Sequence, residues 1–324
     1  MEEFIEFAYH LTGPQRGRAM TADAEIAAAL RDPAPAWVHL SAADSRSAGW
    51  IDAHLHHLDA PVREALTEEQ TRPRAVALGA GLLVNLRGIN FNEGSDPEDM
   101  VSVRLWIDGN GIVSLSRRPL RSVAAVAARV AAGQGPARSG DFLAELVEEL
   151  TERQEAQVAD LEERAEALEA ETVADPHPAL SARLSDMRLE LIGLRRFLAP
   201  QREAIQAILR AQMAWIEDID AKLIAEQLDQ GARMLEGLEA MRDQFQTIRD
   251  ELEAARDERT NRNLYILSVI SAVFLPLGFL TGLMGINLGG MPGAGSSAGF
   301  WIFSGALVAI GLAVLLVMRR MRLF

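Results

Sequence analysis

The chain has 324 residues, no cysteine, only two tyrosines, and no acidic residue after Glu258. Without cysteine it forms no disulfide framework and no thiolate metal site. Between Phe274 and Phe303 there is no Asp, Glu, Lys, Arg or His at all. Because 24% of the whole sequence is charged, this bare stretch is the first feature that a structure must explain.

Common enzyme motifs are missing as well. The sequence has no phosphate-binding glycine loop, no nucleophile elbow and no HExxH pair, which argues against an enzyme. The first ten residues, MEEFIEFAYH, are acidic and lack a basic region followed by an apolar core, so they do not predict a signal peptide. We therefore expect a protein that is not an enzyme and that holds no resident cofactor.

The charges that are present divide the chain into an acidic body and a basic-edged apolar tail. Residues 1–258 hold all 46 acids and have a net charge of −19, whereas residues 259–324 have a net charge of +5. An acidic body repels nucleic acid and attracts cations. Cations are therefore expected partners, and nucleic acid is not.

Two apolar runs in the tail are long enough to cross a bilayer. Each has about 20 residues, which at about 1.5 Å per residue matches a hydrocarbon core of ~30 Å. Arginines flank the pair at its outer ends, so the positive-inside rule puts both chain termini in the cytoplasm. We expect a multi-pass protein of the inner (plasma) membrane, with transmembrane helices at 263–284 and 300–324 and an uncharged extracytoplasmic loop at 285–299.

The first 140 residues alternate short apolar runs with helical patterns, which predicts an α/β domain with a mixed sheet. TADAEIAAALRD, with Thr21 as a candidate cap, and SRSAGWIDAHLHHL both have helical spacing. IDGNGI predicts a hairpin between the last two strands. The predicted strands are Ala36–Leu40, Arg74–Leu78, Gly81–Leu86, Val103–Ile107 and Ile112–Ser116.

Residues 141–262 have the charged, amphipathic pattern of long stalk helices, with predicted breaks at ADPHP and at Pro200. A helix continuous from Gln201 to Met284 would be on the order of 125 Å long. An apolar seam along it requires partner helices, either in the same chain or in other subunits. The seam consists of Leu228, Leu235, Leu238, Met241, Phe245, Ile248 and Leu252.

Three histidines, His54, His56 and His57, suggest a metal site because imidazole binds zinc. On a helix, His54 and His57 would share a face while His56 would not, and no nearby Cys or acid completes a tetrahedral set. We expect ordinary surface histidines, with a regulatory metal site as the alternative.

The end of the first span carries a motif. The segment GLMGINLGGMPG, with a second span after it, resembles the CorA superfamily of divalent-cation channels and transporters, whose signature is Gly-Met-Asn. Ile286 takes the middle position here, and no acid follows Met291-Pro292, which resembles the ZntB branch linked to zinc. The segments Glu69–Val76 and Leu82–Asp108 are also similar to that branch, so the resemblance covers essentially the whole chain.

The resemblance implies a homopentamer whose first spans line a central pore, whose long helices form a cytoplasmic funnel, and whose outer mouth is formed by Gly285, Ile286 and Asn287. Five Asn287 amides could bind the waters of a hydrated dication; alternatively, Asn287 caps the helix end. The implied function is divalent-cation transport with zinc favoured, and the resemblance admits coupling to protons. The alternatives are a magnesium or cobalt channel of the CorA type and a membrane-anchored coiled-coil scaffold without transport activity.

Heptad steps back from Gly285 predict which face of the first span lines the pore. Small or polar residues alternate there with two leucines that would form hydrophobic constrictions, although small residues also serve helix packing in membranes. No His, Cys or carboxylate lies between Leu264 and Met318, so the ion must pass largely hydrated or bound by neutral oxygens. The predicted pore-lining residues are Leu264, Ser268, Ser271, Leu275, Gly278 and Gly282.

Attraction of cations then has to come from the cytoplasmic acids. Glu217, Asp218 and Asp220 lie before the membrane span, and five copies around an axis would concentrate cations there. The alternative is a solvated helix face on which these acids pair with arginines.

Overall fold

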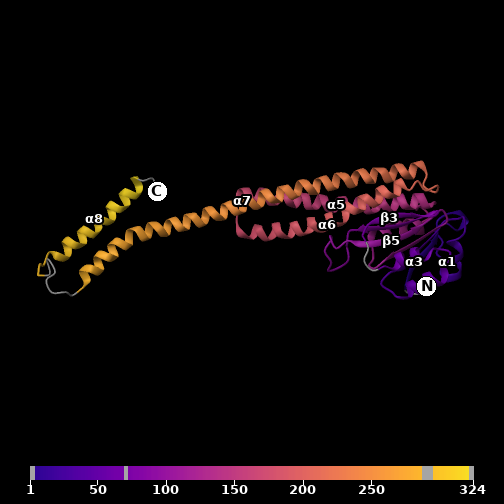
Figure 1. The fold of residues 1–324 in the computed structure, drawn as a ribbon, viewed down its shortest axis with the longest axis horizontal. Coiled ribbons are helices and arrows are strands. Elements are labelled where there is room, and N and C mark those ends of the chain that lie inside the picture. Colours follow the sequence, from indigo (N-terminus) through magenta and orange to yellow (C-terminus); the bar gives the residue numbers. More distant parts are fainter. Residues whose placement is uncertain (1–3, 69–71, 287–294, 321–324) are drawn as a thin grey trace. The chain divides into compact units, whose positions relative to one another are not determined.

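The computed structural model describes residues 4–68, 72–286 and 295–320. It contains two compact units, Met1–Arg249 and Asp250–Phe324. The first unit has a layered α/β part and three long helices, and the second contains the apolar helices (Figure 1). The α+β fold class, the long stalk helix and the two C-terminal apolar helices are as the sequence predicts.

A six-stranded mixed sheet forms the centre of the α/β part, in the order β1-β2-β6-β5-β4-β3. The five predicted strands and the antiparallel β5–β6 hairpin are confirmed, and β2 pairs parallel with β6. The edge strand β1 was not predicted. The bounds are β1 Ile5–His10, β2 Ala36–Ser41, β3 Arg74–Leu78, β4 Gly81–Gly88, β5 Val101–Ile107 and β6 Gly111–Ser116.

Helices cover both faces of the sheet. On one face, α1 (Asp23–Ala29), α2 (Arg46–His54) and α3 (Ala60–Thr67) pack on side chains such as Val38 and Leu115. On the other face, α4 (Arg121–Ala131) and the adjacent parts of the long helices pack on side chains such as Val84, Leu105 and Trp37. Since both faces are buried, the central strands consist of nearly continuous apolar runs.

Two details of the predicted short helices are wrong. The residue before α1 is Ala22, which makes no capping bond, so Thr21 is not the cap. Helix α2 ends at His54, where the ring Nδ1 lies 3.1 Å from the Trp50 carbonyl oxygen and the ring stacks on Trp50. His56 and His57 therefore follow the helix and do not share a helical face with His54. Among the described residues there is no group of three or more His, Cys, Asp or Glu placed to hold a metal ion.

Four long helices make up the rest of the described chain: α5 Ser139–Ala174, α6 Pro178–Arg210, α7 Asp218–Gly285 and α8 Gly299–Arg320. The break after α5 is confirmed, but the break expected at Pro200 is wrong, because α6 continues through it to Arg210. A helix continuous from Gln201 to Met284 is wrong as well, because the chain turns between Arg210 and Asp218. Gln201 just beyond the proline is buried, and its Oε1 accepts the Arg87 N–H at 2.6 Å. Packing on the sheet therefore outweighs the hydrogen bond that the proline removes.

The apolar seam of α7 is buried within a single chain. Leu238, Met241, Phe245 and Ile248 are all buried without any second copy. Helices α5, α6 and α7 lie side by side as a three-helix bundle (Figure 1), joined by side-chain bonds between each pair of helices. The partners that the seam required are thus helices of the same chain, so the seam is not evidence for an oligomer.

Candidate functional site

Helices α7 and α8 each contain a segment long and apolar enough to cross a membrane, and none of either segment is buried inside the chain. Between these helices the structure describes Ile286 and residues 295–298. The predicted pore-mouth residue Asn287 lies outside the described residues. Gly285 is the last residue of α7, and Ile286 follows it with 47% of its surface exposed.

One face of α7 is turned toward α8. Within its apolar part, the half-buried residues Val269, Val273, Pro276 and Leu280 recur at steps of three and four, as does Leu277 beside them. A Cβ at Gly311 of α8 would lie 3.7 Å from the Leu277 Cδ1 atom. The two helices therefore pack through this face.

The predicted pore-lining residues lie on the other side of α7. At about 100° per residue, their stripe centres roughly opposite Val273, so α8 leaves it uncovered. All six are exposed in the single chain, Leu264 at 56% and Leu275 at 74%. The Ser268 hydroxyl donates to the Leu264 carbonyl oxygen at 2.8 Å, so the face presents no strong metal ligand.

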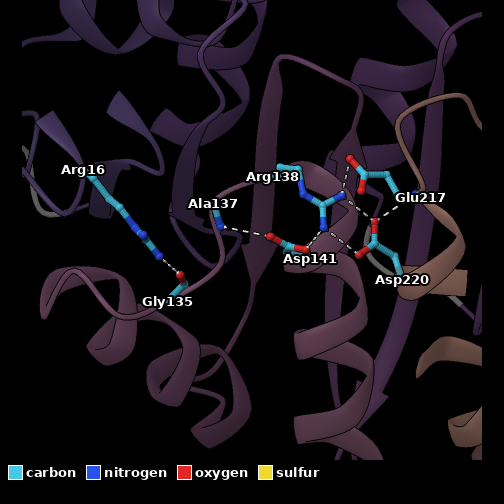
Figure 2. Close-up of polar contacts among 7 residues, drawn as sticks. All are labelled: Arg16, Gly135, Ala137, Arg138, Asp141, Glu217 and Asp220. Carbon is cyan, nitrogen blue, oxygen red and sulfur yellow. Dashed lines mark hydrogen bonds and ion pairs between the residues drawn. The ribbon is translucent and has the colours of Figure 1, made fainter. Parts of the chain in front are cut away.

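The predicted funnel acids lie at the turn that leads into α7, and two of them, Glu217 and Asp220, contact Arg138 (Figure 2). The Arg138 guanidinium donates to both carboxylate oxygens of Asp220, at 2.9 and 3.1 Å. It also pairs with Glu217 at 3.0 Å and with Asp141. Asp220 additionally accepts the backbone N–H of Glu217 at 2.9 Å.

The start of α5 and the start of α7 approach each other closely in this cluster. A Cβ at Gly140 would overlap the Asp220 carboxylate, so glycine is what allows the start of α5 to reach the start of α7. Trp215 in the turn donates its indole N–H to the Ala80 carbonyl oxygen at 3.0 Å. Hydrogen bonding to Asp220 raises the pKa of Arg138, and burial raises the pKa of the Asp141 carboxyl.

This arrangement differs from the open acidic funnel that the sequence suggested. The Asp220 side chain is only 1% exposed and is paired with Arg138, so it stabilises the turn and does not face solvent. Glu217 is 59% exposed but shares the same arginine. Of the three acids, Asp218 alone is exposed and free of an ion pair within the described part of the chain.

Three acids further along α7 follow the alternative of arginine pairing. Glu226 pairs with Arg233 at 3.3 Å, and Asp243 with Arg242 at 3.2 Å. Glu239 pairs with Arg195 of α6 at 2.8 Å. These pairs weaken, residue by residue, the field that the acid count alone implies.

Sequence reasoning missed Arg138 as the centre of this cluster. Its ion pair with Asp220 joins residues 82 positions apart, and no spacing rule connects them. The one local signal is the position of Arg138 directly before α5. Asp141, three residues later in the first turn of α5, forms an ion pair with it.

Comparisons with known proteins bear on the whole chain. Residues 33–320 match the family described as CorA-like Mg2+ transporter protein. The divalent cation transporter CmaX of Pseudomonas aeruginosa is 34% identical over 305 residues, which cover 93% of this chain and 91% of that one. The zinc transport protein ZntB of Yersinia enterocolitica is 33% identical over 308 residues, or 95% of this chain and 92% of that one.

The solved structure of the full-length CmaX protein has the same fold. It superposes with a TM-score of 0.84 at 33% identity and covers 99% of both chains. Sequence, apolar helices and fold therefore agree over the full length. The chain belongs to the CorA family of divalent-cation transporters, as a membrane protein that is not an enzyme.

Proposed function

We propose that five copies of this chain assemble around their α7 helices and carry divalent cations, zinc in particular, along the stripe from Leu264 to Gly285. The observation that carries the proposal is the position of this stripe. It lies on the side of α7 away from α8 and remains exposed in one chain. A central pore would give these small and polar residues a function that lipid contact does not.

The chemistry of the stripe suits a cation that keeps its water shell. Ser268 and Ser271 offer hydroxyls, and Gly278 and Gly282 leave room for water. Leu264 and Leu275 would narrow the path and gate it by dewetting. At the outer mouth, Gly285, Ile286 and Asn287 would form a neutral ring that orders water around the ion without trapping it.

Zinc is favoured by the loop after the first span, where glycine follows Met291-Pro292 and no acid is present. The relatives named for zinc and the relative named for divalent cations in general are similar to this chain to the same degree. A magnesium or cobalt channel is therefore the second candidate. Tyr265 is the only ionisable side chain between Leu264 and Met318, so proton coupling would not use a carboxylate or histidine in the spans.

The experiment is ion flux into liposomes that contain the purified protein, measured for Zn²⁺, Mg²⁺ and Co²⁺ with and without a pH gradient. Native mass spectrometry of the same preparation measures the oligomer. We expect a pentamer with the fastest flux for Zn²⁺. Flux of Mg²⁺ that exceeds that of Zn²⁺ would favour the second candidate, and a monomer without flux would overturn the proposal.

Orientation follows from the same proposal. Arg259 and Arg262 precede the first span, Arg319 and Arg320 follow the second, and the segment between the spans carries no charge. Both termini would then lie in the cytoplasm and the loop outside the inner membrane. Because the chain has no cysteine, single cysteines at Ser297 and at Ser185 can be labelled in intact cells by an impermeant maleimide. Only the first is expected to react.

A further inference from the structure

A groove of about 460 Å³ runs between α6 and α7 within the N-terminal unit. Phe245 is buried in it, whereas Ile192 is 58% exposed. Leu189 beside it on α6 is 65% exposed. Every charged residue that lines the groove is an arginine, although the chain as a whole carries −14. The lining includes Arg188, Ile192, Arg195, Arg196, Arg242 and Phe245.

Part of this positive charge has no counterpart in the chain. Arg195 and Arg242 pair with Glu239 and Asp243 of α7. Arg188 and Arg196, by contrast, take part in no ion pair with any residue that the structure describes. Arginine is enriched in protein interfaces, and burial of exposed apolar side chains such as Ile192 and Leu189 by a partner is favourable.

The matching surface is the outward side of α5. Ala159 is exposed there between Glu155 and Glu163, and Ala170 is exposed one turn beyond Glu166; the three glutamates are also exposed. None of these three glutamates has an ion pair in the part of the chain described. At about 100° per residue, Ala159, Glu163 and Ala170 lie opposite the buried side of α5, and Glu155 and Glu166 lie at the edge of this surface. Small alanines leave room for Ile192, and the carboxylates complement the arginines.

Within the bundle, the groove and the outward side of α5 lie at the same height along the helix axes but on different sides of the bundle. Glu190 of α6 accepts hydrogen bonds from Gln157 and Arg164 of α5, at 2.9 and 2.7 Å, so these parts of the two helices are level. Ile192, next to Glu190, lies on the α7 side of α6. In a bundle of three helices, the groove between α6 and α7 lies opposite α5, so one copy cannot close it with its own α5.

We propose that the groove between α6 and α7 receives the outward side of α5 from a second copy of this chain. Two different surfaces then meet at each contact, which is the heterologous type that closes into a ring. A ring whose axis runs along the bundle closes only if both surfaces lie at the same height along that axis. The hydrogen bonds to Glu190 place the groove and the outward side of α5 at the same height. The inference rests on the proposed pentamer and specifies a contact that holds it together.

Cysteine cross-linking tests the contact directly, because the native chain has no cysteine. Ile192→Cys and Ala159→Cys are placed in separate full-length chains with different tags, which are co-expressed, purified and oxidised. We expect a disulfide-linked dimer that carries both tags. The matched control pairs Ile192→Cys with Val173→Cys, which is 70% exposed but about 20 Å further along α5, and should not cross-link.

Charge reversal supplies a second readout. Arg188→Glu should shift the oligomer toward smaller species in native mass spectrometry, and adding Glu163→Arg should restore it. Arg210→Glu changes an exposed arginine of the same helix outside the groove and should have no effect.

The outcomes separate this contact from the proposed function. A pentamer with zinc flux but no cross-link, in which Ile192→Cys reacts freely with maleimide, overturns the contact and leaves the function standing. The contact is also overturned if Ile192→Cys is protected only by anionic liposomes, because a lipid surface then occupies the groove. A specific cross-link in protein without zinc flux supports the contact while the function fails.

Discussion

The two units of the chain differ in how far a single copy satisfies its own side chains. In Met1–Arg249 both faces of the sheet are covered, and buried acids such as Asp220 and Glu190 are paired with arginines. In Asp250–Phe324 the large apolar side chains stay exposed, Leu275 at 74% and Phe274 at 67%. The core of the first unit is thus closed within one chain, and only surface features such as the groove between α6 and α7 stay open, whereas the apolar side chains of the second unit need lipid around them.

This difference implies that stability and transport respond to different residues. Changes in the buried core of the N-terminal unit should alter unfolding, because the contacts of that core close within the chain. Changes at the exposed stripe or the loop after it should alter ion flux with little effect on unfolding. Each prediction below tests that separation, beginning with the largest expected effect.

Asn287→Ala should reduce divalent-cation flux to the background of empty liposomes, a loss of about 100-fold or more if the amide ring orders the hydrated ion. The thermal unfolding of the protein in detergent and its oligomer size should not change. Ser297→Ala, another neutral change in the connecting segment, serves as the control. Near-normal zinc flux in the Asn287 variant would assign the residue to capping of the helix end.

Asp220→Ala should instead lower the stability of the fold and leave the ion flux of the folded protein unchanged. Loss of the buried carboxylate leaves Arg138 with weaker partners and the Glu217 N–H without its acceptor, so we expect unfolding to become easier by about 2–3 kcal/mol. Chemical unfolding of the purified protein measures this. Asp218→Asn, which changes an exposed acid two residues away, should cost less than about 0.5 kcal/mol. Loss of flux in a folded, assembled Asp220 variant would contradict the separation.

The sequence predicted the sheet well and its connections poorly, for identifiable reasons. Runs such as Gly81–Leu86 are apolar throughout because both faces of the sheet are covered, so they are conspicuous. The edge strand β1 was overlooked because it forms neither a continuous apolar run nor a strict alternation, and only Ile5 and Ala8 of it are buried. Pro200 predicted a helix end, but long-range packing of Gln201 keeps α6 intact.

The candidate site was predictable where the signal is periodic and not where it depends on distant contacts. The apolar spans follow from length and composition. The stripe follows from heptad spacing and stays a prediction, since the structure shows only that α8 contacts the other side of α7. The pairing of Asp220 with Arg138 depends on how α5 and α7 meet. Counting acids along α7 therefore overestimated its free charge.

The next prediction concerns pH and the N-terminal unit. His39 is buried, with its ring nitrogens 2.7 Å from the Ser114 hydroxyl and 3.1 Å from the Ser116 hydroxyl, and 3.7 Å from the Glu6 carboxylate. Burial lowers the pKa of His39 to about 3. The pKa of histidine in the unfolded chain is ~6.5. Below that pH the unfolded chain binds a proton at His39, and the folded chain does not. The free energy of unfolding should therefore fall by about 1.4 kcal/mol per pH unit as pH drops below ~6.5.

Chemical unfolding followed by tryptophan fluorescence between pH 7 and pH 5 measures this slope. Trp37 reports on the site, because its indole N–H donates to the Ser114 hydroxyl at 2.7 Å. His39→Gln removes the titrating ring and should flatten the slope by that amount, while other groups contribute equally to both proteins. An identical slope in the variant would show that His39 does not control the acid response.

The smallest effect is expected for the acids that remain exposed before α7. Glu217 shares Arg138, and Asp218 alone adds unpaired charge, which a Debye length of about 8 Å at physiological salt screens strongly. The double change Glu217→Gln with Asp218→Asn should therefore alter zinc flux by less than about twofold at any pH between 5.5 and 8. Tyr265→Phe, which removes the only ionisable side chain of the spans, should leave the pH dependence equally unchanged, because protons would then move along water in the pore. Loss of pH dependence in the double variant would make these two acids the proton sensor, and would show that the N-terminal unit controls transport as well as its own stability.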